Sequence, residues 1–346
     1  MTPLQALFNI DLPIIQAPMA GVQASAMAVA VSNAGGLGSL PCAMLTTELM
    51  RSELAAIRAQ TDKPFNVNFF CHIPPTPCEE REARWRHALA HYYAEFGIDP
   101  VTIPGGSGRL PFTADSADVL AEFKPPIVSF HFGLPSAELM ARVRLWGAKI
   151  LSSATTVDEA RWLEAHGVDA IIAQGLEAGG NRGVFLSSDL TTQVGTFALL
   201  PQIVRAVNLP VIAAGGIADA KGVKAALSLG AVAAQVGTSY LLCPEATTSG
   251  PHRVALKSEA ARHTALTNLF TGRPARGIVN RIMRELGSIS AAAPEFPLAT
   301  AAIAPLRAAA EKLGSGDFSP LWSGQNASGC KEIGAAELTR ELAALF

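Results

Sequence analysis

Short apolar segments alternate along the chain with longer amphipathic ones. Eight of the short segments are rich in β-branched and other apolar residues, often at consecutive positions, which is typical of parallel strands buried on both faces. They are PIIQAP at 13, GLGSL at 36, FNVNFF at 65, IVSFHFG at 127, KILSSA at 149, AIIAQG at 170, VIAAGG at 211 and AAQVGT at 233. We predict a strand at each.

The segments between these strands carry an apolar residue at every third or fourth position, as expected for helices with one buried face. Examples are Met50, Leu54 and Ile57; Leu139, Val143 and Trp146; and Phe197, Leu200, Val204 and Val207. Thr156 and Glu159 have the spacing of a capping box, and Gly167 is placed to end that helix. Strand and helix alternating eight times predict an α/β protein with a (β/α)₈ TIM barrel; an open doubly wound sheet is the alternative.

Two stretches do not follow the repeat. Residues 72–120 exceed a simple connection, and we predict an insertion over the barrel mouth that includes the loop IPGGSGRLP. Residues 246–316 are predicted to be a smaller, mainly helical substrate or lid region. The segment AAELTRELAALF then supplies the helix that closes the barrel. The predicted barrel therefore comprises residues 1–245 and 317–346.

Amino-acid composition limits the kinds of partner that this protein is expected to bind. The 346 residues are 49% hydrophobic and 16% charged with a formal net charge of -2, so we expect neither nucleic acid nor an anionic membrane surface as a partner, but a small molecule. The amino-terminal residues lack the pattern of a signal peptide and no apolar run has the length of a membrane span, which predicts a soluble, cytoplasmic protein. Five cysteines predict reduced thiols. The oligomeric state is not readable, and a homodimer stays open.

Glycines occur at the ends of two neighbouring predicted strands, as a Gly-Gly pair and as a Gly-Thr pair. Gly215 and Gly216 end the seventh strand, and Gln235, Val236, Gly237 and Thr238 end the eighth. In a TIM barrel this is where phosphate commonly binds, because glycines expose backbone N–H groups and a helix start adds partial positive charge. Tight turns are the simpler explanation for one such pair. Since there is neither a GxGxxG motif nor a Walker lysine, a mononucleotide such as FMN fits better than NAD or ATP.

Polar residues at other strand ends are candidates for contacting the rest of a flavin. Asn68 ends the third strand and Gln174 the sixth; both have apolar neighbours and would be buried without a partner if no ligand were bound. Ser129 and His131 lie on one side of the fourth strand. Ser129 is at least equally suited to capping its own loop. His131 is either a core histidine with a satisfied ring or a functional group.

Several of these segments together resemble the class I nitronate monooxygenases. The segments are IIQAPMAGV, FNVNFF, VSFHFGLP, AQGLEAGGNRG, AAGGI, QVGT, FTGRPARGIVNR and SPLWSGQ. The resemblance implies an FMN-dependent enzyme that oxidises alkyl nitronates, including propionate 3-nitronate, with O2 to carbonyl compounds and nitrite. It implies no need for a metal or a nicotinamide.

Site residues follow from the resemblance by position. Met19 would place its backbone at the isoalloxazine, Asn68 and Gln174 would bind flavin, and Gly179 and Gly180 would line the approach to it. The phosphate would be held by Gly215, Gly216, Gln235, Val236, Gly237 and Thr238.

One position departs from the family pattern. The family's loop reads GGHRG, and its histidine is assigned to substrate binding and proton transfer, whereas this chain has Asn181. An amide can hydrogen-bond but cannot titrate near neutrality, so it cannot remove a proton from a neutral nitroalkane. A nitronate is already deprotonated, and we expect its oxidation to survive in weakened or altered form. His131, with a pKa near neutrality, would be the alternative catalytic base.

Two other functions are compatible with the sequence. One is an NAD(P)H-dependent quinone or enoyl reductase, because related flavin barrels perform hydride transfer. The other is a flavin-binding protein whose catalysis was weakened by the loss of the loop histidine.

Overall fold

The computed structural model describes residues 3–105 and 109–346. Eight parallel strands form one sheet in the order β1-β9-β8-β6-β5-β4-β3-β2, and a parallel bridge between Ile15 and Leu37 joins its two edges. The predicted (β/α)₈ barrel is therefore confirmed and the open sheet is excluded. The strands are β1 (Ile14–Gln16), β2 (Gly38–Pro41), β3 (Phe65–Phe70), β4 (Ile127–His131), β5 (Lys149–Ala154), β6 (Ala170–Gln174), β8 (Val211–Ala214) and β9 (Ala233–Val236).

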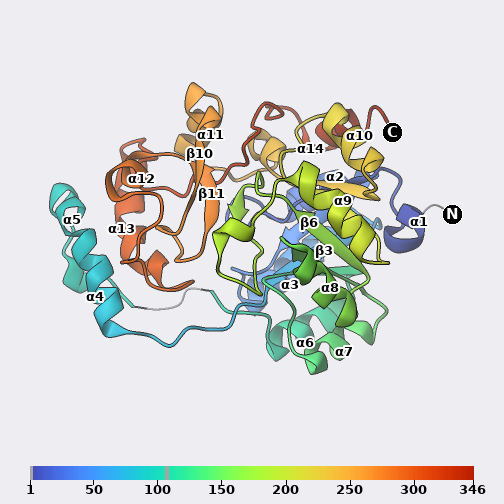
Figure 1. Cartoon of the computed structure of the whole chain (residues 1–346), viewed down its shortest axis with the longest axis horizontal. Helices are drawn as coiled ribbons and strands as arrows, with labels where there is room; N and C mark the ends of the chain where they lie inside the picture. The colour runs from blue at the N-terminus through green and yellow to red at the C-terminus, as the bar shows by residue number, and fades with distance from the viewer. Residues whose placement is uncertain (1–2, 106–108) are drawn as a thin grey trace.

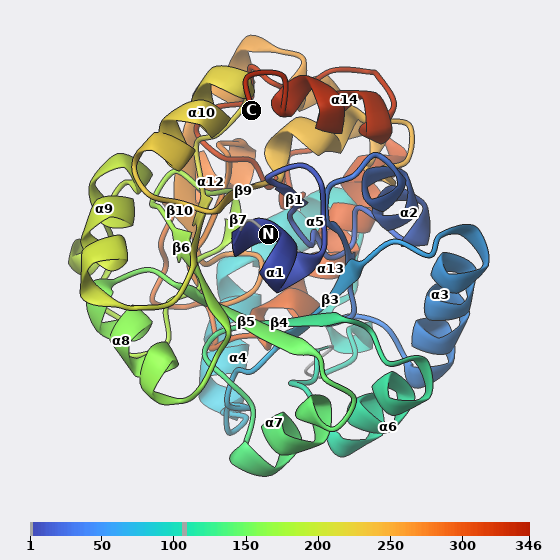
Figure 2. The same cartoon turned by 90° about the vertical axis from the view of Figure 1, so that its right-hand side faces the viewer.

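A ring of helices surrounds the barrel (Figure 2). In α3 (Thr47–Gln60) the Thr46 side chain caps the first turn, and Met50, Leu54 and Ile57 are buried, as the period predicts. Phe197 is an exception, because it is 76% exposed at the start of its helix. The other helices of the ring are α2 (Ser25–Asn33), α6 (Ala114–Phe123), α7 (Ala137–Arg144), α8 (Val157–Ala165), α9 (Thr196–Ala206), α10 (Ala220–Ser228) and α14 (Ala335–Leu342).

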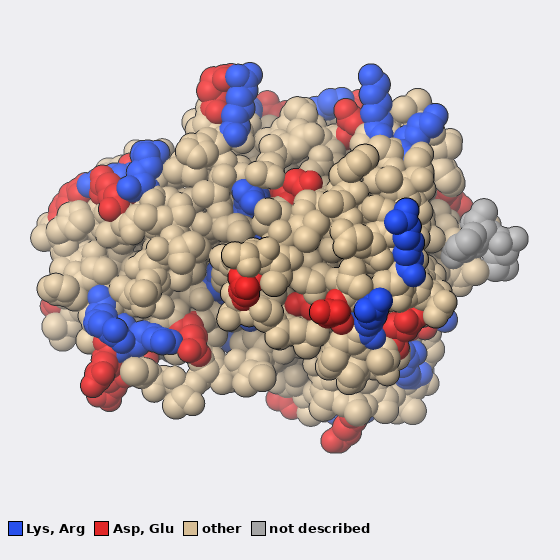
Figure 3. Space-filling model, viewed as in Figure 1, with Lys and Arg blue, Asp and Glu red and all other residues tan. Residues whose placement is uncertain are grey.

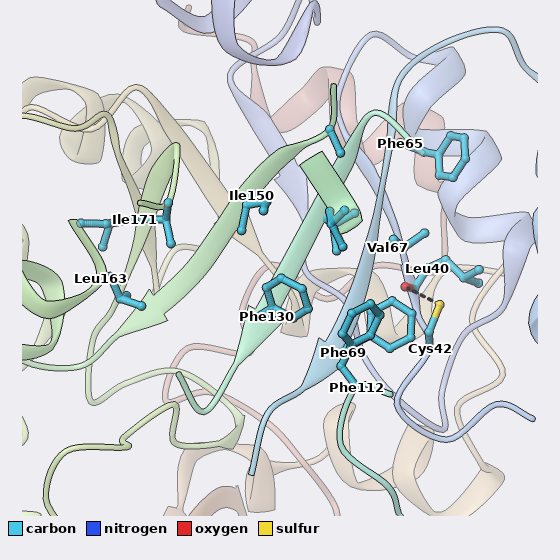
Figure 4. Close-up of a cluster of buried hydrophobic side chains, with 14 of the residues drawn as sticks. Leu40, Cys42, Phe65, Val67, Phe69, Phe112, Phe130, Ile150, Leu163 and Ile171 are labelled. Carbon is cyan, nitrogen blue, oxygen red and sulfur yellow. Dashed lines mark hydrogen bonds between the residues drawn. The ribbon is translucent and has the colours of Figure 1, made fainter. Parts of the chain in front are cut away.

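Alternation along the strands separates two apolar layers. On β3, Phe65, Val67 and Phe69 join the cluster between the barrel and its helices (Figure 4). The intervening Asn66 and Asn68 therefore point to the other side of the strand, as a period of two requires. A separate apolar cluster joins the strands to the first helix. Its members include Ile15, Leu37, Leu151, Ile172 and Ile212 from or next to the strands, with Leu4 and Phe8 from the helix. This helix, α1 (Pro3–Phe8), lies across one end of the barrel in Figure 2.

A smaller lobe packs beside the barrel (Figure 1). Its core joins Trp85, Tyr92 and Tyr93 to Ile303 and Leu306, so the first helices of the 72–120 stretch pack on the lobe. The end of that stretch is barrel helix α6. The lobe helices are α4 (Glu79–Ala88), α5 (Ala90–Phe96), α11 (Gly250–Leu256), α12 (Arg281–Leu286) and α13 (Ala299–Lys312). Residues 106–108 of the predicted loop IPGGSGRLP lie outside the described residues.

The 246–316 region also contains strands, which the sequence analysis did not predict. β10 (Thr264–Thr267) pairs antiparallel with β11 (Ala275–Ile278). β11 in turn pairs with β7 (Gly180–Asn181), which lies in the loop after β6. The segments are short and their partners distant in sequence, so no local period indicates them. Through the pairing of β11 with β7, this small sheet connects the lobe to the barrel loop that carries Asn181.

Charged side chains on the face shown in Figure 3 occur in small groups that mix both signs. Of the helices within residues 3–105 and 109–346, none combines the length and apolarity needed to cross a bilayer.

Candidate active site

A cavity opens where the carboxyl ends of the barrel strands meet the smaller lobe. Its empty volume is about 1360 Å³, including the part open to solvent. Twelve of the thirteen predicted site residues line it: Met19, Asn68, His131, Gln174, Gly179, Gly180, Asn181, Gly215, Gly216, Gln235, Gly237 and Thr238. Val236 does not. Its side chain is buried in the helix-side cluster with Ile14 and Val31, because neighbouring residues of a strand face opposite sides.

One end of the cavity presents bare backbone amides. Within the described residues, the N–H groups of Gly216, Gly237 and Thr238 have no acceptor. Gly215 has φ +116, and a Cβ added there would lie 2.9 Å from the Thr196 Oγ1 atom. The segment is thus built for glycine, and its converging donors suit an anion such as phosphate.

Buried side-chain hydrogen bonds hold the loop that carries Asn181. The Arg182 side chain is fully buried and donates to the carbonyl oxygens of Gly175 at 2.6 Å and Gln174 at 2.9 Å. Burial lowers the pKa of Arg182 to about 10, so this guanidinium stays charged at neutral pH. Glu177 accepts hydrogen bonds from the Thr196 N–H and hydroxyl, both at 2.8 Å. Glu177 therefore anchors the loop.

Asn181 points an unpartnered amide at the cavity. Its backbone oxygen accepts hydrogen bonds from His131 Nε2 at 3.0 Å and from Gln174 Nε2 at 3.1 Å. Its side-chain Oδ1 is buried without a partner, and its Nδ2 makes no hydrogen bond within the described residues. The backbone is thus fixed while the side-chain amide is free for a ligand.

The contacts of His131 determine its tautomer. A carbonyl oxygen can only accept, so Nε2 carries the proton that is donated to Asn181, and Nδ1 accepts from the Ser153 hydroxyl at 2.9 Å. Burial lowers the pKa of His131 to about 4, the Asn181 hydrogen bond opposes this shift, and the charges of Arg273 and Arg182 lower the pKa further. The pKa near neutrality that a substitute base would need is therefore not found.

Two further amides line the cavity. Asn68 Nδ2 donates to the Ser129 hydroxyl at 2.9 Å, so Ser129, which is fully buried, holds Asn68 in place. Gln235 Oε1 is buried and has no partner. Because buried polar atoms are nearly always satisfied in a working protein, the free oxygens of Gln235 and Asn181 indicate a ligand with hydrogen-bond donors.

Sequence reasoning missed several lining residues, notably Arg109, His252 and Trp322. His252 Nε2 donates to the Trp322 carbonyl at 3.0 Å, and burial lowers the pKa of His252 to about 4. Trp322 belongs to SPLWSGQ, one of the segments that carry the resemblance. The sequence therefore offered a reason to place Trp322 at the site. Arg109 lies in the insertion, whose position relative to the strands no local pattern gives.

The arginines of TGRPARG connect the lobe to the barrel. Arg276 Nε donates to the Leu176 carbonyl at 2.9 Å, and Arg273 donates to the Val184 carbonyl. Arg273 also lies 4.0 Å from the centre of the Phe132 ring.

The comparison with known proteins agrees with the geometry. A family model described as nitronate monooxygenase matches residues 1–344. The chain belongs to the nitronate monooxygenase family. It is 45% identical to a nitronate monooxygenase of Paraburkholderia phytofirmans, covering 98% of this chain and 93% of that protein. It is 43% identical to a nitronate monooxygenase of Pseudomonas aeruginosa, covering 97% and 96%.

A solved structure of a nitroalkane oxidase from Streptomyces ansochromogenes superimposes with a TM-score of 0.89 at 40% identity, covering 99% of this chain and 97% of that one. The chain is therefore an oxidoreductase of the nitronate monooxygenase type, and the reductase alternative is not favoured. Nitronate monooxygenases are flavin-dependent. The bare amides at the ends of β8 and β9, and the free Gln235 and Asn181 oxygens, fit such a cofactor.

Proposed function

We propose that this protein uses FMN and O2 to oxidise alkyl nitronates to carbonyl compounds and nitrite, and that it acts poorly on neutral nitroalkanes. The observation that carries this proposal is the Asn181 side-chain amide, which lines the cavity without a protein partner. Such an amide can donate to a nitro oxygen but cannot remove a proton from carbon.

FMN is proposed as the flavin because a terminal phosphate would match the three unpaired amides at the ends of β8 and β9. These donors are backbone groups, whose positions the barrel holds rigidly. Heat-released cofactor, compared by mass spectrometry with FMN, FAD and riboflavin, tests the assignment. Recovery of FAD or riboflavin alone would refute it.

The bound flavin supplies the redox chemistry, which is electron acceptance from the nitronate and electron delivery to O2. The chain itself orients the substrate. Asn181 Nδ2 is placed to donate to a nitro oxygen, and Gly179 and Gly180 leave room beside it. His131 acts one step back as a positioning residue, because it holds the Asn181 carbonyl.

The charge around the site favours an anion. Within the described residues, no carboxylate lines the cavity. Arg109 lines it directly, and Arg182 and Arg273 lie close enough to lower the pKa of His131. A nitronate anion is stabilised in such a positive potential, whereas a neutral nitroalkane gains little from it.

Oxygen uptake should separate the two substrate forms. With ethylnitronate we expect turnover, and with nitroethane at least about 100-fold less, because a positioned base typically contributes that factor or more. Asn181→His should raise turnover of nitroethane by about 10-fold or more, and Asn181→Ala should not. Equal rates of the unmodified protein on both forms would refute the proposed substrate preference.

His131→Asn is expected to lower kcat for ethylnitronate by about 10-fold while the protein keeps its flavin, because the Asn181 backbone loses one of its two side-chain donors. The pH profile of kcat should keep its shape, since the ring does not transfer the proton. Ser153→Ala should give a smaller loss. A new or missing titration step in the His131→Asn profile would instead identify His131 as a base.

A further inference from the structure

Arg109 stands at the junction of two cavities. It lines the active-site cavity together with Phe70 and Asn181. It also lines a second cavity on the lobe side, whose other walls are mainly apolar; they are His72, Pro74, Pro75, Pro77, Glu82, Gly105, Leu110, Pro297 and Leu298. A molecule extending from Asn181 toward the lobe would therefore pass the Arg109 guanidinium.

This guanidinium has almost no partners in the part of the chain that the structure describes. Its one hydrogen bond, to Thr300 Oγ1, is long at 3.5 Å, and it lies 5.7 Å from the centre of the Phe296 ring. Desolvation by burial, followed by the like charge of Arg307, lowers the pKa of Arg109, and no carboxylate offsets either effect. An arginine with five N–H donors is thus largely unsatisfied beside the substrate site.

Two other half-buried or buried arginines of the described residues have several partners each. Arg281 pairs with Glu95 at 2.7 Å and with Glu285 at 2.9 Å. Arg182 donates to three oxygen atoms inside its loop. Among the charged side chains of the described residues, only Arg109 lines the active-site cavity, since the other ionisable lining groups are the neutral His131 and His252. The charged group that a substrate would meet in this cavity therefore has few protein partners of its own.

We infer that Arg109 is a specificity residue that binds a carboxylate at the end of the substrate remote from the nitronate. The inference rests on the proposed function and deepens it. Asn181 holds the nitro group at the strand ends, and the planar guanidinium accepts a carboxylate in two parallel hydrogen bonds. Glu82 also lines the second cavity and would repel a carboxylate bound next to it, which favours a position beside Arg109.

The test compares two nitronates with the same carbon chain, propionate 3-nitronate and propyl-1-nitronate. In the holoenzyme, Arg109→Gln should raise KM for propionate 3-nitronate by about 10-fold to 100-fold, the equivalent of a lost charge-assisted hydrogen-bonding pair. KM for propyl-1-nitronate should rise by a clearly smaller factor, because this substrate loses only the attraction between the Arg109 charge and its nitronate and has no carboxylate to lose a partner. Arg109→Lys should restore part of the difference, since the charge returns without the planar fork. Arg84→Gln, at an exposed arginine of α4, is the matched control and should leave both KM values unchanged.

A binding measurement gives a second, turnover-free readout. By calorimetry, 3-nitropropionate should bind the unmodified holoenzyme more tightly than 1-nitropropane, and Arg109→Gln should abolish that difference. Equal losses for both nitronates, or no loss for either, would overturn the role of Arg109 while the proposed function stands. If the unmodified enzyme oxidises neither nitronate, the proposed function fails, and the calorimetric comparison still decides whether Arg109 binds a carboxylate.

Discussion

Gly237→Val is expected to yield a folded protein that no longer retains flavin. Gly237 has φ -115, which any residue adopts, so the substitution introduces no backbone strain. A side chain there would begin 3.3 Å from Ala17 Cβ and 3.6 Å from Met19 Sδ, against the cavity wall. It would keep a phosphate away from the Gly237 and Thr238 N–H groups, and the loss of such charge-assisted bonds should weaken binding by about 100-fold or more.

The ratio of flavin absorbance to protein absorbance after desalting measures this effect, and a thermal melt of the apoprotein checks the fold. Gly222→Ala is the matched control. Gly222 lies inside α10, and an added Cβ would make only ordinary contacts there, the nearest at 3.4 Å, so flavin should be retained. Normal flavin content in Gly237→Val would contradict the placement of the phosphate at the ends of β8 and β9.

The free energy of unfolding should fall steeply as the pH is lowered from about 6.5 to about 4. Three buried histidines carry this expectation: His72, His131 and His252, each with its pKa lowered from 6.5 to about 4, chiefly by desolvation. Between these values the unfolded chain binds more protons than the folded one, so stability increases with pH. At about 1.4 kcal/mol per pKa unit, the total loss is on the order of 5 kcal/mol or more.

Urea denaturation of the apoprotein between pH 4 and pH 7.5 measures the slope of about one proton per histidine. His252→Phe should reduce the slope, whatever it does to stability at neutral pH, because one titrating group is removed. His87→Asn, at an exposed histidine of α4, is the control variant. A constant free energy of unfolding across this range would show that the three rings are accessible to protons in the folded protein.

Much of the site was predictable because the carboxyl ends of parallel strands meet at one end of a barrel. Once the strands ending at Phe70, Gln174, Ala214 and Val236 were identified, the polar and glycine residues at and after their ends had to lie together. Val236 is the one predicted site residue that does not line the cavity, for a local reason. The strand alternates, and this side chain faces the helices.

The sequence left the role of His131 open for a different reason. Its position at the cavity was predictable from the strand, but its chemistry depended on the Ser153 hydroxyl and the Asn181 carbonyl, which come from two other segments. A pKa is set by burial and by neighbouring groups, and these are known only after the chain has folded.

By itself, the sequence determined the barrel and the glycines at its strand ends that suit a flavin phosphate, because strand and helix periods and backbone-exposing glycines are local properties. It also showed that Asn181 replaces the loop histidine of the family. Only the tertiary structure decided that β7 pairs with β11, that His131 is a neutral donor, and that Arg109 reaches the active-site cavity. These depend on contacts between residues far apart in the chain, whose packing follows from the whole fold.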